Sequence, residues 1–209
     1  KEIEPFRETE DVDFLLDSAK EDFERFITGT GFYKRMKGHP IIGIEDEFLL
    51  TIPTVHQREE VEINIKGFID LIYRDENGIV VVDHKTSKKV FDKAKRRKDL
   101  QLPIYFMAIE QKYGEYPYKG TYNFTKLNKH QETLFANNIS KAMDERMNKR
   151  NPDKIYGCPP TKAKREIIET FKDMNDEKKR WIAKPSFLCH WCSFKSICAD
   201  ASDWKPKER

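Results

Sequence analysis

The stretch that decides the fold is GFIDLIYRDENGIVVVDHKTSKK, residues 67–89. Two segments rich in β-branched and aromatic residues flank Glu76-Asn77-Gly78, which is a turn signal of the kind that closes hairpins. The stretch therefore predicts an antiparallel hairpin with one strand over 61–74 and the next over 79–83.

Two carboxylates and a lysine converge at one end of this hairpin. Asp70 and Asp83 lie on partner strands, and because side chains alternate along a strand, Asp83 and Lys85 face one side and His84 the other. Placing these charges close together costs free energy unless a cation or an anionic ligand binds at the same site. Carboxylate oxygens suit a hard divalent cation, and a neighbouring lysine can orient or deprotonate a water that attacks phosphorus. The alternative is a solvated ion pair on a surface hairpin.

Hydrophobic periodicity predicts further elements on both sides of the hairpin. These are a helix over 9–28, a strand over 41–52 separated from the hairpin by a polar loop, a helix over 99–113, a second hairpin from 120–126 and 131–135, and helices over 136–150 and 162–183.

This order predicts an α/β fold whose mixed sheet is flanked by helices. At 209 residues the chain is long enough for one substantial core. We expect a single domain over 1–209, with its core over about 41–135 and a helical, cysteine-containing lobe over about 136–209. No apolar segment reaches the ~18 residues of a membrane span, so no membrane association is expected.

Net charge does not identify a partner, because 39 basic and 36 acidic residues nearly balance. Their distribution is more informative. A dense basic run directly follows Lys85, and beside a hydrolytic site its natural ligand is a phosphate backbone, whereas alone it reads as a solvated loop. Nothing in it encodes base readout, so little sequence specificity is expected. The run consists of Lys88, Lys89, Lys93, Lys95, Arg96, Arg97 and Lys98.

Three of the four cysteines lie close together as Cys189-x₂-Cys192-x₅-Cys198, and the fourth is Cys158. The close spacing of the first pair is typical of thiolate metal sites. A zinc site completed by His190 or Cys158 fits this pattern, and buried free thiols are the alternative.

The motifs of the hairpin and the following helix resemble those of the PD-(D/E)XK nucleases, and within them the RecB-type branch that includes CRISPR-associated adaptation nucleases and phage exonucleases. Gly67-Phe68-Ile69-Asp70 matches the G-x-x-D motif of that branch, and Val82-Asp83-His84-Lys85-Thr86 matches its D-x-K-T motif. Gln101 and Tyr105, one helical turn apart, match its Q-x-x-x-Y motif. The resemblance implies a restriction-endonuclease-like core.

The resemblance also implies the roles of these residues. A Mg²⁺ or Mn²⁺ ion would be held by carboxylates with the help of the His84 carbonyl, and the glutamine and tyrosine would position the substrate backbone or the attacking water. The implied catalytic set is Asp70, Asp83, Lys85, Gln101 and Tyr105.

A further acidic ligand precedes the hairpin in many members of the resembled family. Glu45 and Glu47 are the candidates here. We favour Glu45, because its spacing to Phe48 resembles the family's E-x-x-F pattern; either residue reads equally as a solvated surface group.

The cysteines resemble the C-terminal part of a [4Fe–4S] site that staples the chain end to the nuclease core in the RecB-type branch, with zinc as the alternative. The family's fourth cysteine normally precedes the nuclease motifs, and this sequence has none there. Either Cys158 takes that place, or the ligand belongs to residues before Lys1.

The resemblance therefore implies a metal-dependent DNA exonuclease that hydrolyses phosphodiester bonds in recombination, repair or phage DNA processing. The expected partner is DNA with free ends, with a helicase or recombination protein as a further candidate, in the cytoplasm of a bacterium or encoded by a phage. Two alternatives belong to other classes: a non-catalytic nucleic-acid-binding module with a structural zinc or Fe–S site, and a zinc-stapled interaction domain.

Overall fold

The structure is a computed structural model of the chain. It describes residues 12–28, 32–134 and 155–179, and in the C-terminal segment residues 189, 192, 193, 197 and 198. The chain divides into two compact units, Lys1–Glu169 and Thr170–Arg209. The helix expected over 136–150 and the lobe boundary expected near residue 136 lie outside the described residues.

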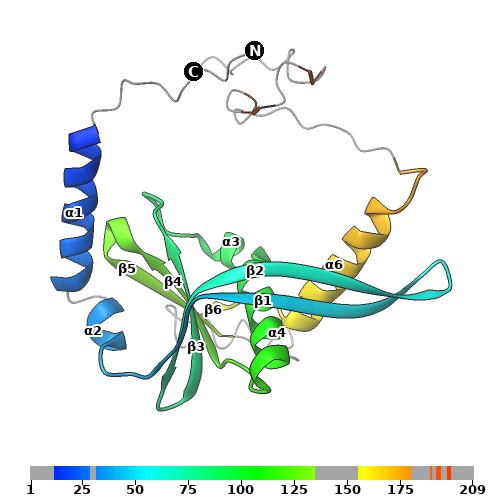
Figure 1. Ribbon diagram of the computed structural model, residues 1–209, viewed down its shortest axis with the longest axis horizontal. Coiled ribbons are helices and arrows are strands. Elements are labelled where there is room, and N and C mark those ends of the chain that lie inside the picture. Colours follow the sequence, from blue (N-terminus) through cyan, green and yellow to red (C-terminus); the bar gives the residue numbers. More distant parts are fainter. Residues whose placement is uncertain are drawn as a thin grey trace. The chain divides into compact units, whose positions relative to one another are not determined.

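A mixed six-stranded sheet forms the centre of the first unit, with its strands in sequence order (Figure 1). The pairs β3–β4 and β5–β6 are parallel and the others are antiparallel. The predicted mixed sheet and both predicted hairpins are confirmed. The strands are β1 (Ile41–His56), β2 (Glu59–Asp75), β3 (Gly78–Lys85), β4 (Lys119–Phe124), β5 (Lys129–Leu134) and β6 (Ile155–Tyr156).

Helices connect and follow these strands. The parallel strands β3 and β4 are joined by a helical crossover, as parallel pairing requires. The helices are α1 (Val12–Thr28), α2 (Phe32–Met36), α3 (Lys93–Lys98), α4 (Gln101–Tyr113), η1 (Thr125–Leu127) and α6 (Pro160–Met174). No helix in the described part of the chain is both long and apolar enough to cross a membrane.

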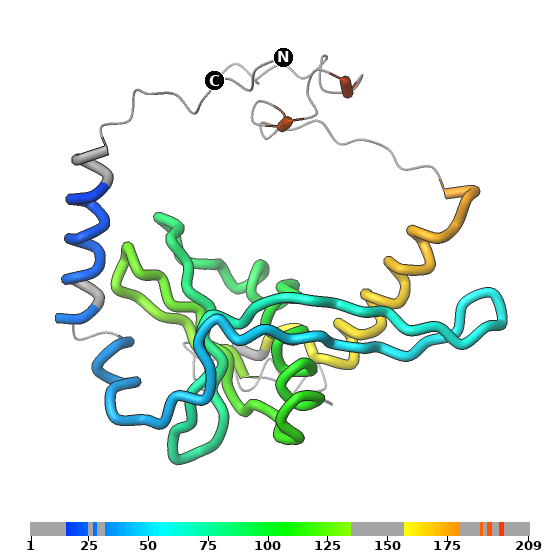
Figure 2. Tube along the Cα trace, viewed as in Figure 1, coloured from blue at the N-terminus to red at the C-terminus, as the bar shows by residue number. Residues whose placement is uncertain are grey.

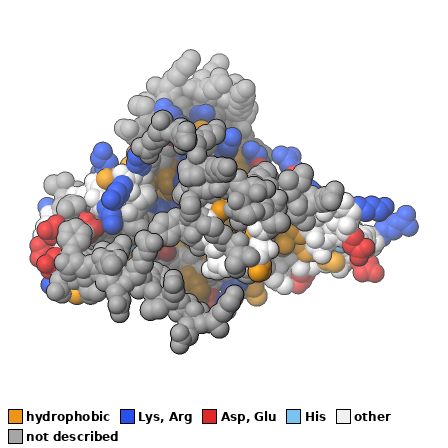
Figure 3. Space-filling view, turned by 90° about the horizontal axis from the view of Figure 1, so that it is seen from above, with side chains coloured by type: hydrophobic (Ala, Val, Ile, Leu, Met, Phe, Trp, Pro, Cys, Tyr) orange, Lys and Arg blue, Asp and Glu red, His pale blue; other side chains and the backbone are white. Residues whose placement is uncertain are grey.

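The first two strands form a long hairpin that projects beyond the other strands (Figure 2). The polar loop expected between them is short, because Gln57 and Arg58 both take left-handed φ values, 51° and 72°. Two such residues make the turn that matches the twist of paired strands, so pairing continues to the last pair, His56 and Glu59. Exposed acidic and basic side chains gather at this end (Figure 3).

Apolar side chains cover both faces of the central strands. Val80 and Val82 of β3 pack with Phe32 of α2, and burying each such side chain stabilises the fold by about 1.5–3 kcal/mol. Helix α4 covers the other face, where a Cβ on Gly120 would lie 2.9 Å from Leu102 Cδ1. Gly120 therefore allows the close approach of α4 to β4.

Helix α6 ends at Met174, so the helix expected over 162–183 is wrong in its extent. The Asn175 side chain donates to the carbonyl of Phe171 at 2.8 Å, and the Asn175 backbone N–H donates to the same carbonyl. An asparagine that competes in this way for a helix carbonyl favours the end of a helix.

Candidate active site

Asp70 and Asp83 lie at a fork where two strands of the sheet separate. The β2–β3 ladder ends at the pair Leu71–Val82, and the two aspartates are the next opposed positions. From there β1 and β2 turn away from β3 (Figure 1). Asp70 Oδ2 accepts a 2.6 Å hydrogen bond from the backbone N–H of His84, so a carboxylate takes the place that a strand carbonyl would otherwise fill.

The Asp83 carboxylate is buried, with an exposed fraction of 2%. Its Oδ2 lies 2.6 Å from Lys85 Nζ as an ion pair, and it accepts no hydrogen bond from any other described residue. Burial raises the pKa of Asp83 to about 6; Lys85 opposes that shift, and the neighbouring carboxylate of Asp70 adds to it. The site therefore holds negative charge that its own side chains compensate only in part.

Lys85 connects this carboxylate to helix α4. Its ammonium donates to Gln101 Oε1 at 2.8 Å, and Gln101 Nε2 donates to the Tyr105 hydroxyl at 2.7 Å. Burial raises the pKa of Tyr105 to about 12, so its hydroxyl stays protonated at neutral pH. The structure thus links Asp83, Lys85, Gln101 and Tyr105 by direct contacts and places Asp70 opposite Asp83.

Glu45 lies nearer to this group than Glu47 does. It is the position of β1 opposite Asp70, since its neighbours on both sides pair with the neighbours of Asp70. Its charge acts on His84 together with that of Asp70. Glu47 instead forms an ion pair with Lys66 at 2.5 Å.

A sequence model of the PD-(D/E)XK nuclease superfamily matches residues 7–199. The chain belongs to the PD-(D/E)XK nuclease superfamily. No curated protein matches it. Fifteen chains of solved structures match, among them the crystal structure of SSO0001, with a TM-score of 0.42 and 17% sequence identity over 91% of this chain and 71% of that chain. A likeness at that level has no bearing on the activity of this superfamily member.

Members of this superfamily usually use Mg²⁺ or Mn²⁺, and the donors at the fork fit such an ion chemically. Hard divalent cations take oxygen ligands, and Asp83 offers a buried oxygen that has no hydrogen-bond donor besides Lys85 among the described residues. Asp70 supplies a second carboxylate opposite it. Across the described ranges, however, no three side chains of the His, Cys, Asp and Glu types are already assembled around one point.

Asp99 is a carboxylate of this nuclease-superfamily site that sequence reasoning missed. It follows α3, accepts a 2.9 Å hydrogen bond from the Gln101 backbone N–H, and hydrogen-bonds the Tyr122 side chain. Its charge also raises the pKa of Asp83 and of Tyr105. An aspartate just before a helix is typical of capping, so the sequence alone indicated no more than a helix start.

The His84 ring lies on the other face of the sheet, as the strand alternation predicted. Asn123 Nδ2 lies 3.0 Å from His84 Nδ1, and the Phe32 ring meets the imidazole edge-on. Burial lowers the pKa of His84, which favours a neutral ring that accepts from Asn123. The backbone of His84, unlike its ring, faces the fork.

The basic run divides into a buried residue and an exposed set. Arg96 is 4% exposed and donates to the Glu132 carbonyl and to Thr133 Oγ1. Burial lowers the pKa of Arg96 to about 10, which leaves it charged at neutral pH. It joins α3 to β5, which favours a structural role for Arg96, and its contact with DNA stays a prediction. The exposed residues are Lys88, Lys89, Lys93, Lys95, Arg97 and Lys98.

Helix α3 itself was not predicted from the sequence, because KAKRRK has no apolar spacing. It begins where Asp92 Oδ1 accepts from the Lys95 backbone N–H at 2.7 Å. The Lys95 ammonium then lies 3.7 Å from the centre of the Phe91 ring. The cap and the buried arginine together fix the helix.

All four cysteines are free thiols. Cys158 is buried within the first unit, and burial raises the pKa of its thiol. In the second unit, the Cys192 backbone N–H donates to the Cys189 carbonyl at 3.4 Å. His190 lies outside the described residues. The structure brings no cysteine cluster together in the residues it describes, and the cluster stays a prediction.

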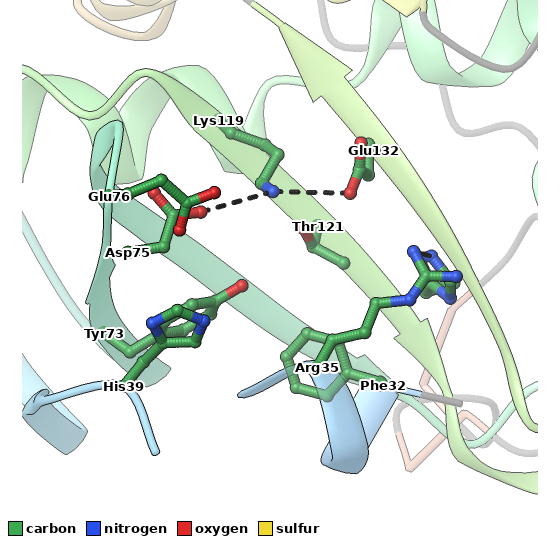
Figure 4. A pocket seen from close by; sticks show the side chains of 10 residues that line it. Phe32, Arg35, His39, Tyr73, Asp75, Glu76, Lys119, Thr121 and Glu132 are labelled. Carbon is green, nitrogen blue, oxygen red and sulfur yellow. Dashed lines mark hydrogen bonds and ion pairs between the residues drawn. The ribbon is translucent and has the colours of Figure 1, made fainter. Parts of the chain in front are cut away.

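A polar pocket of about 180 Å³ lies on the face of the sheet that α2 covers (Figure 4). Lys119 Nζ lies 3.7 Å from Asp75 Oδ2 and 3.3 Å from Glu132 Oε1. Arg35 lies 2.6 Å from His130 Nε2. The charged groups of this pocket largely compensate one another, unlike those at the fork, so we regard the pocket as structural.

Proposed function

We propose that this chain is a metal-dependent DNA exonuclease of RecB type, which hydrolyses phosphodiester bonds with little sequence specificity. The observation that carries the proposal is the position of Lys85. Its ammonium is held between a buried carboxylate and Gln101, beside the second carboxylate of the fork. A structural ion pair would not require this third, orienting partner.

The carboxylates of Asp70 and Asp83, with the backbone carbonyl of His84, are the residues that would hold Mg²⁺ or Mn²⁺, and Glu45 is the further acidic ligand. When bound, the ion would neutralise phosphoryl oxygens and lower the pKa of a water. The low exposure of Asp83 strengthens every charge interaction at this point, because the local dielectric constant is below that of water.

Lys85 presents a cation to the reacting phosphate or to the attacking water. Gln101 fixes the direction of that ammonium, and Tyr105 fixes the Gln101 amide in turn. Since the Tyr105 side chain is 8% exposed and in edge-to-face contact with Phe48, this chain of contacts rests on packed residues. A group held in this way loses little freedom when substrate binds.

The exposed cations of α3 and the preceding loop would hold the DNA backbone. This segment joins the end of β3 directly to the start of α4, so both of its ends lie at the catalytic group. Phosphate contacts of this kind carry no sequence information, which supports cleavage with little base preference.

The C-terminal cysteines would hold a [4Fe–4S] cluster, with Zn²⁺ as the alternative. The close spacing of Cys189 and Cys192 and the hydrogen bond from the Cys192 N–H to the Cys189 carbonyl support this assignment. Cys198 and Cys158 are the further ligands of this proposal. Replacing Cys192 by Ser would then remove the bound iron or zinc, which elemental analysis of the purified chain measures; unchanged metal content would exclude the cluster.

DNA with free ends is the proposed substrate, and the resemblance supports a role in recombination, repair or phage DNA processing beside a helicase or recombination protein. End-labelled linear DNA, single-stranded and duplex, tests the activity in Mg²⁺, in Mn²⁺ and in chelator. Loss of label that needs metal and is absent from Lys85→Ala supports the proposal. DNA that is bound but not cut under any metal would favour the non-catalytic binding module.

A further inference from the structure

The polar face of the β1–β2 hairpin carries an aromatic side chain beside the catalytic carboxylates. Phe68 of β2 is 50% exposed, and it precedes Asp70 by two residues. Side chains two residues apart leave a strand on the same side, about 7 Å from each other. Phe68 is therefore presented to solvent within one nucleotide of the fork.

This phenylalanine is not an isolated surface apolar residue. In the ladder Phe68 is opposite Glu47, and the next position of that face, Lys66, is opposite Leu49. Leu49 is 61% exposed, and as the diagonal neighbour of Phe68 it lies within reach of an aromatic ring. Phe68 and Leu49 together form an exposed apolar patch between the carboxylates and a lysine.

The lysine at the other side of this apolar patch is Lys66. Its ammonium is 2.5 Å from Glu47 Oε1, but both side chains are more than half exposed. Exposed ion pairs of this kind contribute little, so Lys66 can exchange the carboxylate for a phosphate at small cost. Along one face of β2 the order is thus carboxylate, aromatic ring, cation, at a spacing of two residues each.

We propose that Phe68 is a stacking platform for an unpaired base of the DNA strand whose phosphate lies at the fork, with Lys66 contacting a neighbouring phosphate. This inference rests on the proposed function and adds its substrate class. An aromatic ring between a phosphate-binding centre and a lysine has the order that a single strand presents, in which bases stack on rings and phosphates meet cations. A base within a duplex has both faces covered by its neighbours, so the platform selects single strands or unpaired ends.

Binding to Phe68 variants tests the inference, in a Lys85→Ala chain with Mg²⁺ so that DNA is not cut. Fluorescence anisotropy gives the dissociation constants of a labelled single-stranded oligonucleotide and of its blunt duplex. Phe68→Ala should weaken single-strand binding about 5- to 100-fold and lower the ratio of single-strand to duplex affinity, and Phe68→Trp should restore both. An oligonucleotide without bases should bind the Phe68 and Phe68→Ala chains alike.

Val55→Ala is the matched control, because Val55 is 54% exposed on the same hairpin but lies near its far end. It should change single-strand affinity by less than twofold. A Phe68→Ala chain that keeps its single-strand affinity, or loses single-strand and duplex affinity equally, overturns the inference. If the unmodified chain cuts DNA in that case, the proposed function stands alone; if it cuts no DNA in any metal, the proposed function fails and the platform fails with it.

Discussion

The Lys85 ammonium donates a 2.8 Å hydrogen bond to Gln101 Oε1, which ties the last residue of β3 to the first residue of α4. The two residues are sixteen positions apart, and the basic segment lies between them. The direction of a single cation thus depends on how a strand end and a helix start are held together.

Lys85→Ala should reduce the cleavage rate by about 10²- to 10⁴-fold, because the positioned cation is lost while the fold is kept. Single-turnover cleavage of labelled DNA in Mg²⁺ measures the rate, and thermal unfolding checks the fold. Lys112→Ala is the control, since Lys112 also pairs with an aspartate, Asp46, at 2.8 Å. Equal rates for the two variants would contradict the catalytic assignment.

Gln101→Leu should lower the cleavage rate by about 10- to 100-fold with little change in DNA affinity, because the ammonium keeps its charge but loses its orientation. The control is Gln111→Leu on the same helix, whose amide oxygen accepts from the Thr51 backbone N–H. If Gln101→Leu cuts as fast as this control, Gln101 does not position Lys85.

Adjacent arginines should respond in opposite ways. Arg96→Ala leaves the Glu132 carbonyl and the Thr133 hydroxyl without this donor and should lower the free energy of unfolding by about 2–4 kcal/mol. Arg97 is exposed, so Arg97→Ala should change that free energy by less than about 0.5 kcal/mol.

Substitutions of Arg96 and Arg97 should also differ in their effect on DNA affinity. Arg97→Ala should weaken binding and reduce the slope of log affinity against log salt by about one. Urea unfolding and a salt titration of DNA affinity are the measurements. Weak DNA binding by a fully stable Arg96→Ala chain would show that Arg96 contacts DNA.

Asp75 should make stability depend on pH on the acidic side. Burial alone would raise the pKa of Asp75, but hydrogen bonds from Tyr118 and Asn77 with the charge of Lys119 outweigh it and lower the pKa below its ordinary value of 3.8. A carboxyl with a lowered pKa in the folded state stabilises the fold above its ordinary pKa, and this stability is lost as pH falls through the folded value.

The measurement is the difference in free energy of unfolding between the unmodified chain and Asp75→Asn. This difference should be constant between about pH 7 and 5 and should shrink as the pH falls below about 4. A difference that stays constant to pH 2.5, or grows, would show that the carboxylate charge is not the stabilising feature.

Strands β1 to β5 and helix α4 were predictable because local sequence patterns determine them. The apolar run from Ile79 to Val82 and the turn at Asn77-Gly78 determine the central hairpin locally. Helix α3 and the short β6 were missed, since neither has apolar periodicity and each depends on contacts with distant segments.

The candidate site divides in the same way. Asp83 and Lys85 are two residues apart in the sequence, so their common side of β3 followed from alternation alone. The inward direction of Arg96 and the contact of Asp99 with Tyr122 depend on the crossover from β3 to β4, which brings together residues far apart in the chain. No local pattern encodes either one.

Glu45 carries a φ of 47° within a strand, where a residue with a Cβ is strained by about 1–2 kcal/mol and glycine is not. Glu45→Gly should therefore raise the melting temperature while it removes the carboxylate opposite Asp70. A variant with a higher melting temperature and a lower cleavage rate would show that Glu45 supports activity at the expense of stability. A design that stabilises this chain should then retain Glu45 despite its strained backbone.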